Sequence, residues 1–452
     1  MYATRIIPAV AALVTLVAGT PVQAQTSGEV TVHANARDTY DLLDPTTNIT
    51  RKDLVLLRAA RDEGRGETTL TVGAAMTGLM NAQQSNRAGK FGYLMRHPTS
   101  NNQAGQSASE AVLHSAQLRV TGTAGSWITA HMEFLYDPEQ SFGQGTITAP
   151  TRNQVQLRHG VVLLGNLKKS PVYASLGKMA VPFGLMDTVN PFTASTVWHA
   201  FGGLAFGGRI GYQSKGLGVS FMAIQGGAQF RAAHAPVEGT AIPSRTNNFS
   251  VDVNYTFGGS IRTLTDQKVT NRALVGASYI HGSAYCQGFP VVHFQSCDER
   301  NPAYDFYGQL NLSSRLTIQG EFAKTTGVWP GTFNPALPQF AAQKVSSFAL
   351  GGKFRAMADV RPVDVSMEFS RFTAGPTGAP WDDQDQVVLG VSVFVFPSVR
   401  FFGEYINVRG YAPLNFISGG GGPDVTNPDG PETHSDNTAR SHVGMFGMTA
   451  AF

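Results

Sequence analysis

Apolar residues alternate with polar or small residues along most of this chain, and this two-residue period constrains its fold more than any other feature. Between Phe249 and Phe257, for example, Phe, Val, Val, Tyr and Phe alternate with Ser, Asp, Asn and Thr. Successive side chains of a β-strand point to opposite faces, so a strand with this pattern has one apolar and one polar face. We therefore expect a chain built from amphipathic strands.

About sixteen segments show this alternation. They are residues 67–79, 110–122, 126–136, 152–164, 170–181, 203–213, 217–227, 247–257, 271–282, 303–312, 315–325, 343–356, 362–373, 385–396, 399–409 and 440–452. The connections between them change regularly between short and long. Ser313-Ser314 and Pro397-Ser398 are short ones, and the stretches at about 80–109 and 410–439 are long ones.

This regular change separates two all-β folds. A soluble β-sandwich also has amphipathic strands, but nothing in that fold keeps one set of turns short and the other long. An outer-membrane barrel has tight periplasmic turns, long external loops, an apolar outer face and a polar lumen. Closure also pairs every backbone group and removes the sheet edges. We predict an all-β transmembrane antiparallel β-barrel of about 16 strands over residues 67–452, surrounded by the lipid of a Gram-negative outer membrane.

The first 24 residues are typical of a secretory signal peptide. Arg5 precedes an apolar run at about 6–17, and small residues end at Val22-Gln23-Ala24. The run is shorter than the ~20 residues of a membrane-spanning helix. We expect residues 1–24 to direct export and residues 25–66 to form a periplasmic N-terminal segment.

Within that segment, residues 50–63 are typical of a short amphipathic helix. Thr50 can cap its first turn, and Asp53 follows three residues later, which makes a partial capping box. The sequence leaves open whether this helix stays in the periplasm, enters the barrel lumen or contacts another protein.

Charged residues fall in the inward register of the strands, where we expect them to line the pore. They are Arg119, Glu133, Arg158, Lys178, Arg209, Glu321, Lys353, Arg355, Glu368, Arg400 and Glu404. The early strands carry mostly basic residues and the late strands carry most of the glutamates. Opposite signs on opposite walls would place a transverse field across a water-filled pore. The alternative is that these groups are solvated and screened.

The third long connection, "VPFGLMDTVNPFTASTVWHAFGG" (Val181–Gly203), is rich in Phe, Pro and Trp, unlike a solvated external loop. In general porins the third loop folds into the barrel and forms the constriction. By that comparison we expect Asp187, Trp198 and His199 to be lumen residues of a constriction loop. The alternative is a loop packed over the mouth of the barrel.

The stretch "SLGKMAVPFGLMD" (Ser175–Asp187) resembles the G-[KR]-x-x-x-PFG stretch of the phosphate-selective porin O/P group and of LbtU-type siderophore porins. The resemblance is strongest over about 170–225. It implies a substrate-permeable outer-membrane porin for passive diffusion of small hydrophilic solutes or anions, with iron–siderophore uptake as one form. Two departures weaken any transfer of substrate. "NPFTASTVWHAFGG" replaces an acidic run, and Lys178 stands alone where the phosphate porins have lysine clusters.

Four residues suit the outward register of the first five strands poorly: His114, His159, Ser175 and Gly177. A polar group that faces hydrocarbon is costly, and general porins form trimers through this arc. We therefore expect contacts between protomers of a homotrimer here. Alternatively the assigned register is wrong by one residue, which would turn these side chains inward.

The chain ends with "HVGMFGMTAAF", an alternating strand whose last residue is Phe452. A terminal Phe on such a strand resembles the C-terminal signal that the outer-membrane barrel insertion machinery reads. We expect Phe452 to carry this signal.

The two cysteines, Cys286 and Cys297, lie between two expected strands. Thiols of an exported protein meet oxidants, so we predict a disulfide between them. Two free thiols are the alternative.

Composition and motifs exclude several other classes. With 34 Lys and Arg against 31 Asp and Glu, nothing points to a nucleic-acid partner. There is no G-x-S-x-G elbow and no H-E-x-x-H or C-x-x-C spacing, so we expect no enzyme, no metal site and no cofactor. Residues 25–66 are too few for the plug domain of an energy-coupled receptor. A structural or adhesive barrel, with a packed lumen and no conduction, is the alternative to a pore.

Overall fold

The structure is a computed structural model, and its described residues form ten stretches. They are 31–62, 68–92, 105–136, 155–225, 246–258, 271–286, 300–313, 315–357, 361–412 and 435–452. The expected signal peptide, residues 1–24, lies outside the described residues, so its role in export stays a prediction.

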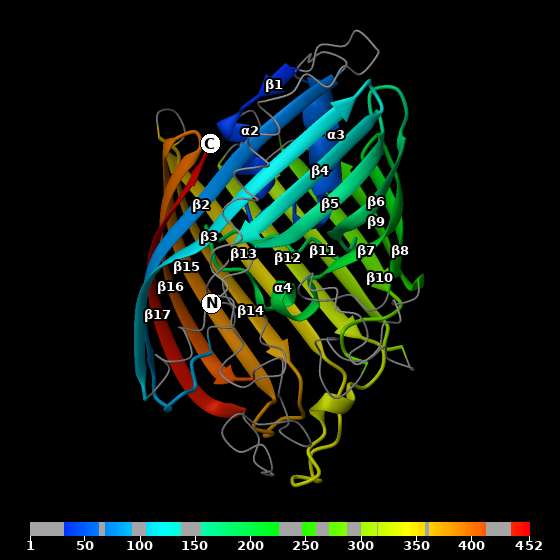
Figure 1. Cartoon of the computed structure of the whole chain (residues 1–452). Helices are drawn as coiled ribbons and strands as arrows, with labels where there is room; N and C mark the ends of the chain where they lie inside the picture. The colour runs from blue at the N-terminus through cyan, green and yellow to red at the C-terminus, as the bar shows by residue number, and fades with distance from the viewer. Residues whose placement is uncertain are drawn as a thin grey trace, which may run out of the picture.

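Sixteen antiparallel strands close into a barrel within the described residues (Figure 1). The strands are β2 (Thr68–Ser85), β3 (Ser107–Ala124), β4 (Ile128–Tyr136), β5 (Val155–Gly165), β6 (Val172–Ala180), β7 (Leu204–Ser214), β8 (Leu217–Gln225), β9 (Thr246–Phe257), β10 (Arg272–Ile280), β11 (Ala303–Leu312), β12 (Leu316–Thr325), β13 (Ser346–Met357), β14 (Val363–Thr373), β15 (Asp383–Phe396), β16 (Val399–Tyr411) and β17 (Asp436–Ala451). Each pairs with the next, and β17 pairs with β2 to complete the ring. The predicted fold is confirmed, and each alternating segment corresponds to one strand.

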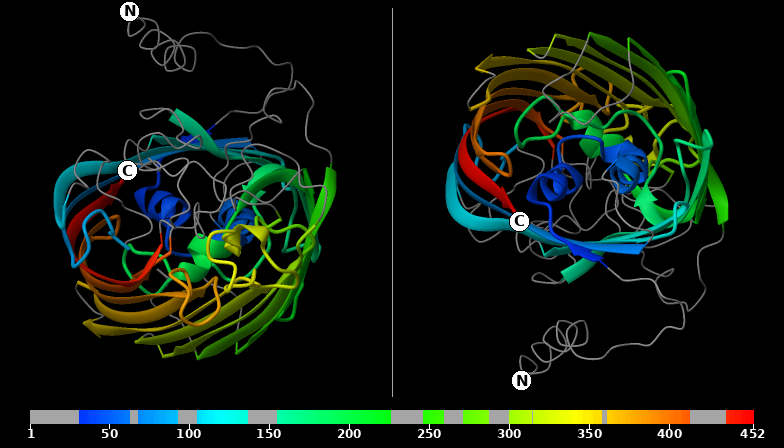
Figure 2. Two further views of the ribbon diagram at one scale, coloured as in Figure 1. Left: turned by 90° about the horizontal axis from the view of Figure 1, so that it is seen from below. Right: turned by 90° about the horizontal axis from the view of Figure 1, so that it is seen from above.

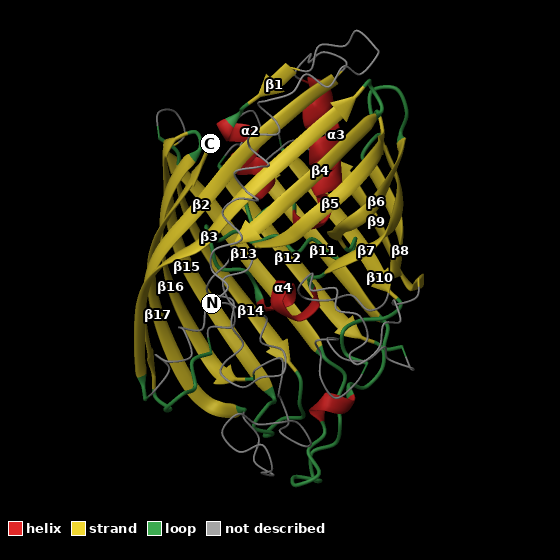
Figure 3. Ribbon diagram, viewed as in Figure 1, coloured by secondary structure: helices red, strands yellow, loops and turns green. Residues whose placement is uncertain are grey.

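Strands form the wall over its whole height, and the two ends of the barrel differ (Figure 3). β2 begins and β17 ends at the same end, at the top of Figure 1, as an even strand number requires. The tight connections lie at that end, for example the one between β15 and β16. We call it the short-turn end and the opposite one the long-loop end. Among the described residues, no helix is both long and apolar enough to cross a membrane.

The outer face of the wall is apolar, as lipid contact requires. Alternate residues such as Met80, Leu176, Ile210 and Phe306 are among its most exposed side chains. The inner face is mixed, because much of it packs against chain inside the barrel. Inward side chains of both kinds are buried there, for example Thr129 and Leu163.

A short strand that the alternation did not predict covers a free edge. β1 (Thr31–His33) pairs in parallel with Thr69–Thr71 of β2. β17 leaves β2 just before this point, since the backbone of Phe452 pairs with Ala74. β1 therefore pairs with the part of β2 that precedes its pairing with β17, where backbone groups would otherwise be unpaired.

Two N-terminal helices lie inside the barrel ring (Figure 2). α2 (Ala36–Leu43) begins at Asn35, whose side chain accepts the N–H groups of Arg37 and Asp38 at 3.1 Å. A 3₁₀ turn, η1 (Ile49–Arg51), leads into α3 (Lys52–Asp62). α3 matches the helix expected over 50–63, whereas α2 was not expected. Where described, the segment expected to be periplasmic thus lies largely within the lumen.

The chain between β6 and β7, residues 181–203, also lies inside the barrel. It contains the short helix α4 (Thr196–Phe201), whose first turn is capped by the Ser195 hydroxyl accepting the N–H of Trp198 at 3.3 Å. At the long-loop end, η3 (Pro330–Thr332) follows β12. Trp329 and Trp381 are fully buried there in a cluster that includes Ala200 of α4.

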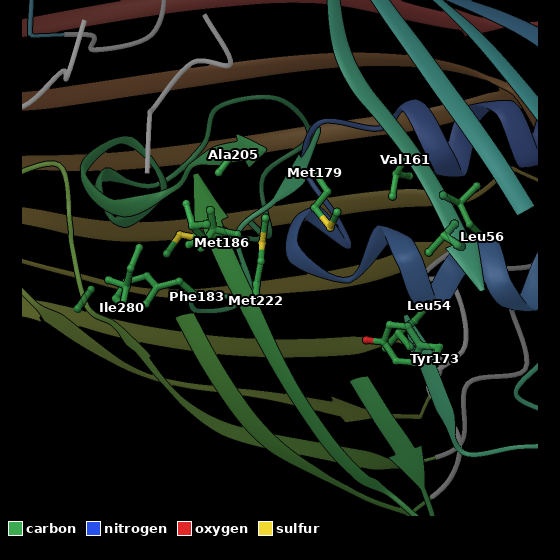
Figure 4. Close-up of a cluster of buried hydrophobic side chains, with 14 of the residues drawn as sticks. Leu54, Leu56, Val161, Tyr173, Met179, Phe183, Met186, Ala205, Met222 and Ile280 are labelled. Carbon is green, nitrogen blue, oxygen red and sulfur yellow. The ribbon is translucent and has the colours of Figure 1, made fainter. Parts of the chain in front are cut away.

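A hydrophobic core occupies part of the lumen (Figure 4). Leu42 of α2 and Leu54, Leu56 and Leu57 of the next helix share one cluster with inward side chains of the wall. The wall and loop members include Val161, Leu163, Tyr173, Met179, Phe183, Met186 and Met222. These contacts remove apolar surface from water, so the N-terminal segment and the loop are packed parts of the fold.

Two β-bulges correct the inward and outward assignment of the first strands. The β2–β3 register skips His114, and the β4–β5 register skips Arg158. Each bulge shifts the alternation by one residue, so His114 and His159 turn inward and are buried. Ser175 is also buried and donates to Asp53 at 2.9 Å. The alternative of a shifted register is therefore the correct one for these three residues.

Candidate functional site

Three glutamates of the inner wall hold the loop 181–203 across the barrel. Glu321, Glu368 and Glu404 lie on β12, β14 and β16, so each is two strands from the next. They contact the loop in chain order. The hydrogen bonds to them are from Leu185 N–H (2.7 Å) and Met186 N–H (3.1 Å) to Glu321, from Thr188 Oγ1 (2.9 Å) and Asn190 Nδ2 (3.2 Å) to Glu368, and from Phe192 N–H (2.7 Å) and Thr193 N–H (3.0 Å) to Glu404.

The strands between these glutamates carry glycines where the loop passes. A Cβ at Gly351 of β13 would lie 2.5 Å from Val189, and one at Gly390 of β15 would lie 2.6 Å from Pro191. Real Cβ contacts are not this short, so the absence of a side chain at both positions lets the loop lie against the wall. The carboxylates and glycines together form a seat for the loop.

Because the loop covers the three glutamates, they do not face open water as the expected transverse field across a pore requires. The three glutamates are inward, as predicted, but their exposed fractions are only 6, 1 and 5 %. Their charges are directed to loop N–H and hydroxyl groups rather than to water in a pore. Charge-assisted hydrogen bonds of this kind hold protein segments firmly. In this arrangement the glutamates position the loop, and a role as pore-lining groups stays a prediction.

The N-terminal segment rests on the loop through Asp187. Arg51 forms an ion pair with this carboxylate at 2.7 Å, and the Ile49 N–H donates to it at 3.0 Å. Burial raises the pKa of Asp187, and the Arg51 guanidinium opposes that rise. The Thr50 hydroxyl donates to the Gly184 carbonyl at 2.9 Å. Asp187 therefore joins the two segments inside the barrel.

The other residues expected in the constriction lie further along the loop. His199 is buried in α4, and Trp198 beside it is partly buried. Their rings meet edge to face at 5.1 Å. All three predicted loop residues thus lie inside the barrel, while their role in a constriction stays a prediction.

The N-terminal segment also binds the wall of the early strands. Lys52 pairs with Glu133 of β4 at 2.8 Å, and the same carboxylate contacts Arg158 at 3.3 Å and His159 at 2.9 Å. Glu133 is fully buried. Burial lowers the pKa of Lys52, and the Glu133 carboxylate opposes that change. Removing one member of this cluster would leave buried charge without its partner, which is costly.

Two more of the predicted pore-lining cations have partners inside the barrel. Arg209 donates to the Thr50 carbonyl at 3.2 Å and lies 3.7 Å from Asp53. Arg119 donates from Nε to the Thr39 hydroxyl of α2 at 3.1 Å. For Lys178 the pore-lining prediction is wrong. Its neighbour Met179 belongs to the lumen core, and its cross-strand partner Phe206 follows the inward Ala205, so the Lys178 side chain lies on the outer face of β6. Its ammonium donates to the Leu157 carbonyl at 2.6 Å and lies over the ring of Phe206.

The remaining predicted cations line a cavity of about 190 Å³ that includes residues of the short-turn end. Its wall is built by α2 and the stretch after it, by the middle of the loop 181–203, and by β13 to β16. The lining residues used below are Arg37, Tyr40, Asp41, Asp44, Val189, Pro191, Lys353, Arg355, Asp364, Ser392, Phe394 and Arg400. Pro362 directly precedes β14, and Pro397 lies between β15 and β16, so the cavity is near that end of the barrel.

Most charged side chains that line this cavity already have hydrogen-bond or ion-pair partners within the protein. Arg355 binds both oxygens of Asp364, at 2.7 and 2.9 Å. Arg400 donates to the Pro191 carbonyl, lies 3.9 Å from Asp44, and has its guanidinium over the ring of Tyr40 at 5.4 Å. Lys353 is different, because it forms no hydrogen bond or ion pair with any other described residue.

Sequence reasoning missed the N-terminal half of this site. Arg51 and Lys52 fall in the helix predicted over 50–63, and no role was predicted for Asp44. The available signal was the run Thr50-Arg-Lys-Asp53 itself. Three consecutive charges on a helix point in different directions, which suits a helix surrounded by wall better than one lying on a surface.

No group of three or more His, Cys, Asp or Glu suited to a metal ion occurs in the stretches that the structure describes. Cys286 is disulfide-bonded. Cys297, its predicted partner, lies outside the described residues, so the pairing stays a prediction.

Comparisons with known proteins agree on the fold. No family model matches the chain. A UPF0422 protein of Coxiella burnetii is 27 % identical over 208 residues, which is 43 % of this chain, and the chain spans 38 % of that relative's length. The outer-membrane channel DcaP of Acinetobacter baumannii has a TM-score of 0.50 at 9 % identity, with 85 % of this chain and 97 % of the DcaP chain covered.

OprB of Pseudomonas putida also has a TM-score of 0.50 at 9 % identity, and the match covers 85 % of this chain and 94 % of the OprB chain. At such identities the likeness shows the fold alone. This chain therefore has the fold of the porin-like outer-membrane β-barrels.

Proposed function

We propose that this protein is a channel of the Gram-negative outer membrane for passive diffusion of small hydrophilic solutes, and that its N-terminal segment closes it in the arrangement described. One observation carries the proposal. The barrel is complete without residues 36–62, yet its inner wall holds them through ion pairs such as Lys52–Glu133 and through Arg209. On this proposal the protein has no enzymatic activity and needs no cofactor.

The ion pairs between the N-terminal segment and the inner wall favour a segment that can leave the lumen. Packed apolar side chains usually stabilise a buried site as well as an ion pair does, so a permanently filled barrel gains little from ion pairs. Charged groups become well solvated once a covering segment leaves, because water replaces their partners. An inner wall with Arg119, Arg158 and Arg209 is therefore suited to two states. In one the N-terminal segment covers these side chains, and in the other water solvates them.

The size of the cavity favours small solutes. Pockets for drug-sized ligands are roughly 300–1,000 Å³, whereas this one is about 190 Å³. Iron–siderophore uptake, which the resemblance of residues 175–187 implies, would need a larger opening than the closed arrangement offers. Small hydrophilic solutes, including anions, are the form of the proposal that fits the present dimensions.

The outer-membrane setting and assembly belong to the same proposal. Phe452 is an exposed terminal residue, and its backbone pairs with Ala74. This is a position that the barrel insertion machinery could read. A homotrimer is supported by small outward residues on β2 and β3, since short side chains let two barrel walls approach closely. They include Ala82 and Ala111. The inward His114, His159 and Ser175 give the trimer no support.

A non-conducting structural or adhesive barrel is the second candidate, and the buried cluster around Leu57 and Leu163 favours it. Single-channel recordings in planar bilayers separate the two. We expect rare openings in the wild type, and openings about 10-fold more frequent or more in the double variant Arg51→Ala, Lys52→Ala, which loses two buried ion pairs. Arg371→Ala, which removes the half-exposed pair with Asp385, should behave as the wild type.

The outcomes are distinct. Silence of both proteins, with correctly folded barrels, would support the structural candidate and overturn the channel. Equally frequent openings in both would keep the channel and remove the closing role of the N-terminal segment. Openings in groups of three would support the homotrimer, and the reversal potential in a salt gradient would give the preferred ion sign.

A further inference from the structure

The cavity at the short-turn end has more hydrogen-bond donors than the protein uses. Within the described part of the chain, the Lys353 ammonium and the Ser392 hydroxyl have no hydrogen-bond partner. The Tyr40 hydroxyl and Nε of Arg400 are buried and likewise have none among the described residues. Buried polar groups are nearly always paired in folded proteins. This rule applies to the Tyr40 hydroxyl and to Nε of Arg400, which are buried. Lys353 is only partly buried, so its ammonium is open to the cavity. Together the four donors point to an acceptor that the chain does not supply.

The charges of the lining favour an anion. Four cations, Arg37, Lys353, Arg355 and Arg400, face three acids, Asp41, Asp44 and Asp364, which leaves a balance of +1. Asp364 is fully engaged by Arg355 in a two-point pair. Asp44 accepts the N–H and hydroxyl groups of Thr46 at 2.9 and 2.6 Å. These two acids are thus occupied, whereas Lys353 is available.

The other half of the lining is apolar. The rings of Tyr40 and Phe394 meet edge to face at 5.5 Å on one side. Val189 and Pro191 of the loop also line the cavity. A cavity of roughly 150 Å³ is enough for a benzene ring, and this one is about 190 Å³. The space therefore fits an organic anion with a small hydrophobic body.

We infer that this cavity binds a small organic carboxylate with an apolar body, with Lys353 and Ser392 donating to the carboxylate and the rings of Tyr40 and Phe394 packing on the body. The inference rests on the proposed function in that the carboxylate would be a solute of the channel. The site is shared between the N-terminal segment and the wall. A bound carboxylate would therefore favour the arrangement in which α2 lies in the lumen.

Calorimetric titration of the purified full chain in detergent with sodium benzoate tests the inference without any conduction. Benzamide, benzylammonium and acetate serve as comparison ligands that lack the charge, reverse it, or lack the ring. We expect benzoate to bind and each of the others to bind about 10-fold more weakly or not at all, because each loses one of the two halves of the site.

Lys353→Met keeps the length of the side chain and removes the ammonium. It should weaken benzoate binding about 10-fold or more, and Ser392→Ala should weaken it less. Lys324→Met is the matched control, since Lys324 lies on the adjacent strand β12 and does not line the cavity. Heat-dependent gel mobility and circular dichroism verify that each barrel is folded.

No benzoate binding to the folded wild type would overturn the inference, as would equal binding by benzamide or an unchanged affinity in Lys353→Met. Binding with silent bilayers would keep the site and overturn the channel. Conduction without benzoate binding would keep the channel and overturn the binding site. The two proposals can therefore fail independently of each other.

Discussion

Arg51, Lys52 and Asp53 are consecutive, yet they bind three different parts of the interior. Arg51 contacts the loop at Asp187, and Lys52 contacts β4. Asp53 accepts the Ser175 hydroxyl of β6. The chain changes there from a 3₁₀ turn to α3, so successive side chains point in well-separated directions. Three neighbouring residues thereby fix the segment against the loop and two strands.

The titration of Asp187 should be visible in the stability of the fold. Burial raises its pKa above the ordinary value of 3.8, with Arg51 opposing. The folded state therefore holds this proton more readily, and the stability from Asp187 is greatest below pH 3.8 and falls as pH rises through the folded-state pKa. The free energy of unfolding of the wild type minus that of Asp187→Asn should fall over this window, by about 1.4 kcal/mol for each pH unit that separates the folded-state pKa from the unfolded-state pKa.

Urea unfolding in detergent at a series of pH values measures that difference. It should level off once the pH exceeds the folded-state pKa, because Asp187 is then ionised in both states. A difference that rises with pH would contradict the direction of the pKa change and would mean that Arg51 dominates over burial.

At the scale of elements, the loop 181–203 and the wall are matched in spacing. Glutamates on β12, β14 and β16 meet the N–H groups of Leu185, Val189 and Thr193, so the loop advances by the same number of residues for every two strands that it crosses. Adjacent strands are ~4.8 Å apart. The loop is therefore held at three separate places rather than at one hinge.

Loss of one anchor should loosen the loop locally. Glu404→Ala removes the acceptor of the Phe192 and Thr193 N–H groups, while Glu321 keeps its hold on Leu185. A hydrogen bond to a charged group contributes about 1.5–3 kcal/mol, so amide exchange at 192–193 should become roughly 10- to 100-fold faster. Hydrogen exchange with mass spectrometry measures this.

Glu110→Ala is the control for that experiment. Glu110 lies on β3 and accepts from Asn81 of the neighbouring strand at 2.9 Å, so its hydrogen bond is made within the wall. Its removal should leave exchange at 192–193 unchanged. Equal acceleration across the whole loop in Glu404→Ala would show one cooperative unit and contradict three independent anchors.

The elements also show where sequence reasoning stops. The strands follow from alternation, because lipid on one side imposes a strict period on residues such as Phe446 and Met448. The bulges at His114 and Arg158 do not follow from alternation. One extra residue gives no local sequence signal, yet it reverses the faces of all later side chains in the strand. The placement of α3 depends on distant partners such as Glu133, which no local pattern identifies.

The whole molecule combines two kinds of interior. Its outer wall faces lipid, and its lumen holds a core packed like that of a water-soluble protein. Leu57 is fully buried in that core, whereas Leu176 on the outer face of β6 is 69 % exposed. Large residues buried in a packed core lose both transfer energy and contacts when shortened, and the cavity adds to the cost.

This division predicts that shortening two leucines lowers the free energy of unfolding by very different amounts. Leu57→Ala should lower the free energy of unfolding by about 2–5 kcal/mol, because the wall around Leu163 and Tyr173 cannot collapse onto the gap. Leu176→Ala should cost about 1 kcal/mol or less, since surrounding detergent fills the space left by an exposed side chain. Urea midpoints in the same detergent compare them directly.

A second measurement separates packing from closure. If α3 packs on the wall only part of the time, Leu57→Ala would change the urea midpoint little but would increase channel openings, and the lumen core would then be a mobile filling. If both quantities change together, the core contributes to the stability of the barrel and to its closure at once. A midpoint lowered equally by Leu176→Ala would contradict the view that the packed core lies inside the ring of strands.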